Sequence, residues 1–163
     1  ASIHRVWPPP GRRSWEFWYV WTLTGVVTVG LAALGVLQWN ALELPDLLRR
    51  GIGLPLTAGG FGFSLWGVAT LGWRRTSGIE GRLVTSGPYR WSRNPQYVGD
   101  AVGLAGWALL SGSALTAVAS AGAILLLLTT PLAEEPWLAD RLGEAYERYR
   151  DRTPRFLGAA GSG

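Results

Sequence analysis

Three long stretches without a charged residue constrain this chain more than any other feature of its sequence. Residues 17–39 and 51–73 are each 23 residues long, and residues 101–133 extend over 33. About 20 consecutive apolar residues are enough for a helix to cross a bilayer. The sequence therefore predicts an all-α integral membrane protein in which the first two stretches are spanning helices.

The third stretch is too long to cross the bilayer once. As a single helix with a rise of about 1.5 Å per residue it would measure roughly 50 Å, against a hydrocarbon core of about 30 Å. We expect a turn at Ser111-Gly112-Ser113, between a short leg at about 97–110 and a longer leg at about 114–130. The short leg is predicted to stop inside the membrane, shielded by the other helices. About four transmembrane or re-entrant segments follow, the third and fourth forming a helical hairpin.

The charged residues predict how the chain is oriented. All 15 basic residues are Arg, and eight of them lie before the first span or between the second and the third. The loop at 40–50 instead balances two acids against two arginines. Because cytoplasmic loops are enriched in basic residues, we expect both termini inside, in a bacterial or archaeal cell membrane. This explains the basic composition without a nucleic-acid partner.

Composition also bounds the domain organisation. The 163 residues have the length of about one domain, which we place at 1–157. We interpret 158–163, rich in small residues, as a linker or tag remnant, and the missing initiator Met as a trimmed start. The sequence contains no Cys, which excludes disulfide and thiol chemistry.

After residue 133 the composition becomes strongly charged, and we expect a cytoplasmic amphipathic helix there. Its apolar stripe consists of Leu138, Leu142, Ala145 and Tyr149. Glu134 and Glu135 precede Pro136 and would begin this helix, where acidic groups complement the positive end of the helix dipole. Glu144 and Arg148 have the spacing of an i, i+4 ion pair.

Small residues are predicted to set how the helices pack. Gly99 and Gly103 form a GxxxG pair, and the second span carries a face of Ala58, Gly59, Gly60 and Gly62. Helices in lipid approach closely through such residues. Two interpretations stay open: the glycines only permit close packing, or the Gly60-Phe61-Gly62 segment opens space for a ligand.

The long polar segment at 74–95 has the composition of a binding loop. Gly87-Pro88 imposes a turn, and Asn94-Pro95 keeps Asn94 out of helical geometry, so the side chains between them are held in fixed directions. Pro95 is well placed to begin the next helix. Asp100 then lies at the membrane boundary, either as the partner of an arginine or as a catalytic group.

Two motifs resemble the isoprenylcysteine carboxyl methyltransferase and phospholipid methyltransferase family. They are LVTSGPYRWSRNPQYVGD and, after the hairpin, AEEPWLADRLGEAYERYRDRTPRF, and together they cover residues 83–156. The matching positions are Arg93, Pro95, Tyr97, Gly99, Glu134, Glu135, Gly143, Tyr146 and Tyr149. The resemblance implies an S-adenosylmethionine-dependent methyltransferase. Its lipophilic acceptor, an isoprenylcysteine-type carboxylate or a phospholipid amine, would enter from the membrane lipids.

The resemblance also implies a site at the cytoplasmic ends of the helices. The implied cofactor-binding residues are Gly60, Gly62, Tyr89, Arg90, Arg93, Asn94, Pro95, Tyr97, Glu134 and Glu135, and the implied catalytic residues are Arg93, Asn94, Glu135 and Arg152. Arg90 or Arg93 would hold the cofactor carboxylate, and Glu134 or Glu135 its amino group or ribose hydroxyls. Many members of the family have His where this chain has Asn94, which cannot take a proton at neutral pH.

The acceptor and the chemistry stay open between alternatives. A carboxylate nucleophile needs no base but favours a nearby cation, Arg152 or Arg155, whereas an amine must lose a proton to Glu134, Glu135 or Asp100. Methyl transfer requires no metal. The Pro-x-Tyr-x-Gly-Asp stretch also resembles the membrane sterol reductases, which use NADPH, and a non-catalytic scaffold is the third interpretation. The sequence does not determine the oligomeric state.

Overall fold

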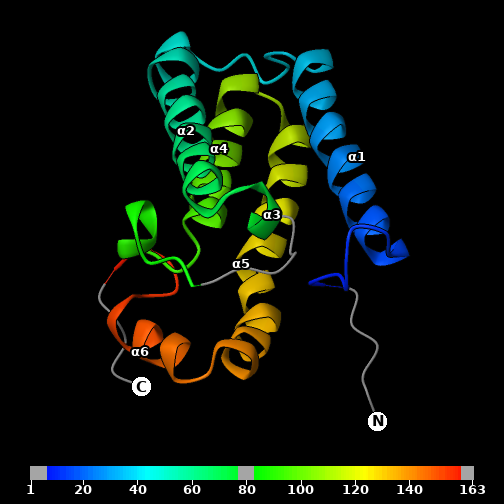
Figure 1. Ribbon diagram of the computed structural model, residues 1–163. Helices are drawn as coiled ribbons and strands as arrows, with labels where there is room; N and C mark the ends of the chain where they lie inside the picture. The colour runs from blue at the N-terminus through cyan, green and yellow to red at the C-terminus, as the bar shows by residue number, and fades with distance from the viewer. Residues whose placement is uncertain (1–6, 77–82, 159–163) are drawn as a thin grey trace.

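The structure is a computed structural model that describes residues 7–76 and 83–158, apart from the side chains of Arg74 and Arg75. All regular structure in these residues is helical (Figure 1), as predicted. Three helices are long and apolar enough to cross a membrane: Trp15–Leu37, Leu47–Leu71 and Ala114–Leu142. The predicted third segment, the short leg of the hairpin, is α4 (Pro95–Ser111), whose 17 residues are fewer than the about 20 of a typical full span. Of the predicted linker, only Gly158 lies within the described residues.

The first two spans are joined by a shorter loop than the sequence predicted. α1 (Trp15–Leu37) begins where the Ser14 hydroxyl accepts a hydrogen bond from the Phe17 amide. The second span begins with the π-helical segment η1 (Leu47–Gly53) and continues as α2 (Leu54–Leu71), so the connection covers 38–46 rather than 40–50. Charged residues can lie in this first turn because Arg49 and Arg50 reach back to Asp46.

The predicted hairpin turn is confirmed. α4 begins at Pro95, ends at Ser111, and is followed by Gly112 in the left-handed conformation, with φ of 60°. Glycine adopts this conformation without steric cost. The Ser113 hydroxyl then accepts from the Thr116 amide and caps α5 (Ala114–Leu142).

The predicted carboxyl-terminal helix is present as α6 (Glu144–Arg152), but its predicted start after residue 133 was wrong. α5 continues through Pro131 and Pro136 and ends at Gly143, whose φ is 55°. The helix therefore does not end where the composition changes at residue 133. It ends where Gly143 adopts a positive φ. Glu134 and Glu135 consequently lie within α5, not at a helix N-terminus. The predicted apolar stripe is divided between α5 and α6 (Glu144–Arg152), where Glu144 and Arg148 form the expected ion pair at 3.2 Å.

The glycines of α2 and α4 bring these two helices into backbone contact (Figure 1). A Cβ atom on Gly60 would lie 2.2 Å from the Gly103 amide nitrogen, and one on Gly99 would lie 2.5 Å from that of Ser64. Close packing is therefore one role of this face, as the sequence indicated. Gly62 is exposed, and a Cβ there would meet nothing within 4 Å.

The two ends of the helix bundle carry different connecting segments (Figure 1). One end carries the 38–46 loop and the turn between α4 and α5. The other carries the start of α1, the short helix α3 (Trp73–Thr76), the 3₁₀ helix η2 (Gly87–Arg90) and α6. The sequence-predicted site residues on η2, α4 and α5 belong to this second end.

Candidate functional site

The loop before α4 is held by hydrogen bonds from two helices. The Tyr149 hydroxyl on α6 donates to the Tyr89 carbonyl at 2.7 Å, and Gln96 on α4 donates to the Tyr89 hydroxyl at 2.8 Å. Tyr89 is buried, and burial raises the pKa of its phenol to about 12. Tyr89 therefore stays neutral at physiological pH and serves to fix the loop.

The chain that follows α6 returns across this loop and binds it. The Arg93 amide donates to the Pro154 carbonyl at 2.9 Å, and the Asn94 side-chain amide donates to the Arg155 carbonyl at 3.0 Å. The buried Ser92 hydroxyl donates to the same carbonyl at 3.2 Å. Asn94, which the resemblance placed in the reaction, thus tethers the carboxyl-terminal segment.

Glu135 is the centre of a buried charge cluster. Its two carboxylate oxygens accept hydrogen bonds from Arg155 at 2.9 and 2.7 Å, and Oε1 lies 3.2 Å from Nη1 of Arg93. The hydrogen bonds to Glu135 raise the pKa of Arg155, which stays charged. Two cations and one carboxylate leave the cluster with one positive charge in excess.

Several polar atoms in this cluster have no hydrogen-bond partner. Among the described residues, the buried Nε atom of Arg93 has no acceptor, and its Nη1 atom has only the poorly aligned ion pair with Glu135. The buried Tyr146 hydroxyl lies beside the same guanidinium and forms no well-aligned hydrogen bond in the part of the chain that the structure describes. Buried donors of this kind are normally satisfied in folded proteins, so these atoms could accept a further hydrogen-bond partner.

Glu134 has very different surroundings from its neighbour. Its Oε1 accepts a hydrogen bond from the Tyr97 hydroxyl at 2.8 Å and another from the Trp7 indole N–H. Both donors are neutral, and no cation pairs with Glu134 among the side chains that the structure describes. The cluster around Glu135 therefore has a net positive charge, whereas the carboxylate of the adjacent Glu134 has no cation to balance it among the described side chains.

Asp100 lies one helical turn from this region. It interacts with the Ser64 hydroxyl on α2, and it forms no ion pair with any arginine whose side chain the structure describes. The role as the partner of an arginine, expected as one alternative, is thus not seen in the part of the chain that the structure describes.

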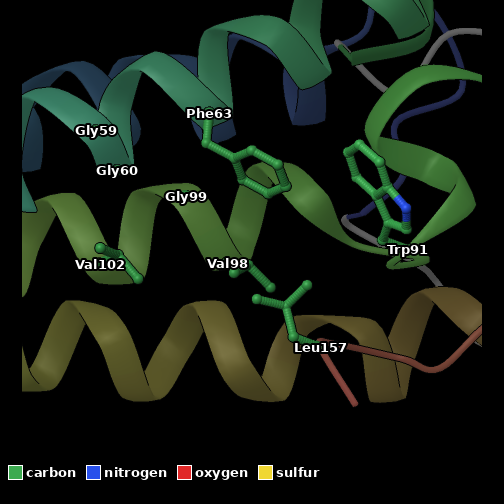
Figure 2. A pocket seen from close by; sticks show the side chains of 8 residues that line it. All are labelled: Gly59, Gly60, Phe63, Trp91, Val98, Gly99, Val102 and Leu157. Atoms are coloured by element: carbon green, nitrogen blue, oxygen red, sulfur yellow. The ribbon is translucent and has the colours of Figure 1, made fainter. Parts of the chain in front are cut away.

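An apolar groove of about 300 Å³ lies beside these clusters, between α2 and α4 (Figure 2). Its lining consists of Gly59, Gly60, Phe63, Trp91, Val98, Gly99, Val102 and Leu157. Trp91 stands at one end of the groove, and Leu157 reaches it from the carboxyl-terminal segment. Gly60 therefore borders open space as well as packing against α4, whereas Gly62 does not line the groove.

The structure brings together only part of the predicted site. Arg93, Asn94 and Glu135 meet in one cluster, Tyr97 contacts Glu134, and Pro95 begins α4. Arg90 instead is exposed, with its guanidinium 5.1 Å from the centre of the Trp91 ring. Arg152 is exposed on the last turn of α6 and forms no ion pair within the described residues.

Sequence reasoning missed two contributions to this region. Trp7 reaches Glu134 from 127 residues away, and no motif in the sequence linked the two. Leu157 reaches the groove only because the carboxyl-terminal segment folds back over the loop. The pairing of Arg155 with Glu135 was also not predicted, although Arg155 was a candidate cation.

The residues that carry these clusters match a known family. The phospholipid methyltransferase family matches residues 48–145, more than half of the chain. The chain belongs to this family. It is therefore an integral membrane protein of a methyltransferase family, with its two glutamates and its loop inside the matched region.

Two curated relatives share most of this chain. It is 36% identical over 145 residues to the cobalt-zinc-cadmium resistance protein CzcN of Cupriavidus metallidurans, covering 85% of this chain and 62% of the relative. It is 31% identical over 134 residues to the nickel-cobalt-cadmium resistance protein NccN of Alcaligenes xylosoxydans xylosoxydans, covering 81% and 61%. The chain thus spans about six-tenths of the length of these relatives. No solved structure matches the chain.

Proposed function

We propose that this family member is an S-adenosylmethionine-dependent methyltransferase whose cofactor site lies at Arg93, Glu134 and Glu135. The main observation behind the proposal is that the surroundings of the two adjacent glutamates have opposite net charge, positive around Glu135 and negative at Glu134. The amino-acid part of S-adenosylmethionine is a zwitterion with a carboxylate and an ammonium group, so it needs a cationic and an anionic partner close together.

The side chains fit this group in detail. The unpartnered Nε and Nη1 atoms of Arg93 and the Tyr146 hydroxyl are donors suited to a carboxylate, and the cluster's excess positive charge favours an anion. Glu134, with only neutral donors, suits the ammonium group. When bound, the cofactor supplies an electrophilic methyl carbon, and the protein's task is to align the acceptor in a dry site.

The apolar groove is the proposed place for the acceptor's hydrocarbon chain. It borders Gly99 on α4, one residue from Asp100 and two from Tyr97, and its lining is almost entirely apolar. The acceptor is either a carboxylate, which needs no base, or an amine, which would give its proton to Glu134 or Asp100. Asn94 cannot take that proton.

Binding of S-adenosylhomocysteine tests the proposal directly. Calorimetry on the detergent-solubilised protein should give heat with S-adenosylhomocysteine and none with NADPH. Glu135→Ala and Arg93→Ala should weaken binding at least tenfold, whereas Arg148→Ala, which removes an exposed arginine of α6, serves as the matched control. Heat from NADPH alone would favour a reductase, and heat from neither ligand would favour a scaffold.

The acceptor can be found by transfer of an isotopic methyl group. Membranes containing the protein, S-adenosylmethionine with a labelled methyl group and extracted lipids should yield a labelled lipid with the native chain and none with Arg93→Ala. Analysis of the product distinguishes an ester, formed from a carboxylate, from an N-methyl group, formed from an amine.

The names of the two relatives favour a second proposed role, in resistance to metal ions. We propose that methylation by this chain supports such resistance in its host. Growth in cobalt, zinc or cadmium should then be impaired by Arg93→Ala and not by Arg148→Ala. Equal growth of both variants would separate this chain from the role in its relatives' names.

A further inference from the structure

We propose that Trp7 is a positioning residue of the cofactor site and acts through Glu134. This inference rests on the proposed function, because it assigns a role to a group that orients one of the proposed cofactor-binding carboxylates. Trp7 donates its indole N–H to Oε1 of Glu134, the same oxygen that accepts from the Tyr97 hydroxyl. No ion pair shares this carboxylate among the described side chains.

The amino-terminal segment holds the indole in place. Pro8 and Pro9 are both buried against the bundle, while Trp7 itself is half-buried. Proline fixes its own φ and restricts the residue before it, so the run of prolines at 8–10 is stiff. Trp7 therefore approaches Glu134 from an anchored segment and not from a loose chain end.

Two donors on one carboxylate oxygen leave the other oxygen available. None of the side chains that the structure describes donates a hydrogen bond to Oε2 of Glu134. This oxygen is also not fully buried. Trp7 and Tyr97 come from different parts of the chain and together fix the plane of the carboxylate. Oε2 is thereby held ready for the ammonium group of the cofactor.

Trp7 lies outside the part of the chain that defines the family. The family match covers residues 48–145, which include Tyr97 and Glu134 but not Trp7. The amino-terminal segment therefore adds a donor to a carboxylate, Glu134, that belongs to the family core. Variation in this segment would tune cofactor affinity without changing the motifs.

The test replaces the donor and keeps the ring. Trp7→Phe removes the indole N–H, and the matched control Trp18→Phe alters a tryptophan that is 63% exposed on α1. A hydrogen bond to a charged group is worth enough for us to expect about tenfold weaker binding of S-adenosylhomocysteine with Trp7→Phe. The Michaelis constant for S-adenosylmethionine should rise by the same factor, and kcat should change little.

A double-mutant cycle separates positioning from general stability. In a Glu134→Ala background, Trp7→Phe should add less than a twofold effect, because the oxygen that accepts the indole hydrogen bond is gone. Trp7→Phe within twofold of the native affinity, or an equal tenfold loss in both backgrounds, would overturn the inference while leaving the proposed function intact. Absence of any binding by the folded native protein would instead overturn the proposed function.

Discussion

Among the side chains that the structure describes, each end of the bundle has one largely buried arginine, Arg49 at one end and Arg93 at the other, and the two have different partners. Arg49, with a side chain that is 4% exposed, donates from Nε to the Leu110 carbonyl at 3.1 Å and lies 4.7 Å from the centre of the Trp39 ring. Arg93, with a side chain that is 10% exposed, shares Glu135 with Arg155. The first arginine contacts neutral groups of the fold and, at 3.9 Å, the exposed carboxylate of Asp46, whereas the second belongs to a largely buried cluster of charges.

The difference shows that burial of an arginine does not by itself mark a site. Around Arg49, backbone hydrogen bonds join the two connections, from Asn40 to Ser111 at 2.6 Å and from Leu42 to Gly112 at 3.0 Å. At this end, Nη2 of Arg49 and Oγ1 of Thr116, on the first turn of α5, have no hydrogen-bond partner among the described residues. Around Arg93, the unpartnered donors include Nε, Nη1 and the Tyr146 hydroxyl, and they coincide with an excess charge. We infer that surplus charge and donors together indicate the functional end.

The largest expected effect concerns which end faces the cytoplasm, which we propose is the Arg93 end. The chain has no Cys, so Ala41→Cys and Ala145→Cys, both at exposed positions, each introduce a single thiol at one end. A membrane-impermeant maleimide applied to intact cells should label the first completely and the second not at all. The opposite pattern would invert the orientation and place the charge cluster outside.

Replacement of the two buried arginines should affect different properties: ligand affinity for Arg93 and thermal stability for Arg49. Arg93→Ala removes two buried donors from the proposed carboxylate site, and we expect roughly a hundredfold loss of S-adenosylhomocysteine affinity. Arg49→Ala should lower the thermal stability in detergent but leave the affinity of the folded fraction within about twofold. Calorimetry and thermal unfolding monitored by circular dichroism measure the two effects. A similar loss of affinity in both variants would remove the distinction between the two ends.

Substitutions at two neighbouring glycines of α2 should distinguish the role of the groove from the role of helix packing. Gly59→Leu projects into the groove without meeting another atom within 4 Å of its Cβ, and we expect about a tenfold loss of methyl transfer with unchanged S-adenosylhomocysteine affinity. Gly60→Ala forces its Cβ against the Gly103 backbone and should instead lower thermal stability. Unchanged transfer by Gly59→Leu would show that the acceptor does not use the groove.

The sequence predicts the helices well because membrane insertion depends on local composition. The long stretches without charged residues predicted the spans, and Ser111-Gly112-Ser113 predicted the hairpin turn. Both signals depend only on residues close together in the sequence. The end of α5 was placed wrongly at residue 133 because a change in composition was read as a change in backbone conformation. Gly143, with its positive φ, carries the actual break.

The site was predicted less completely, because its contacts join distant segments. The motifs named Arg93, Glu134 and Glu135, but the division of charge between the two glutamates depends on Arg155 and Trp7. Neither pairing follows from spacing, since both require the chain ends to fold back onto the bundle. Arg90 and Arg152 looked equivalent to Arg93 in sequence, and only tertiary packing distinguishes them.

The smallest expected effect tests whether Arg49 relies on its ion pair. Asp46 lies 3.9 Å from Nη1 of Arg49 and 3.5 Å from Nε of Arg50, but its side chain is 67% exposed. Exposed ion pairs contribute about 0–1 kcal/mol, so Asp46→Asn should reduce the stability in detergent by less than about 0.5 kcal/mol. Trp39→Leu removes the ring beneath the guanidinium and should cost more, about 1 kcal/mol. If Asp46→Asn were the more damaging change, Arg49 would depend on a carboxylate as Arg93 does, and the contrast between the two ends would rest on the unpartnered donors alone.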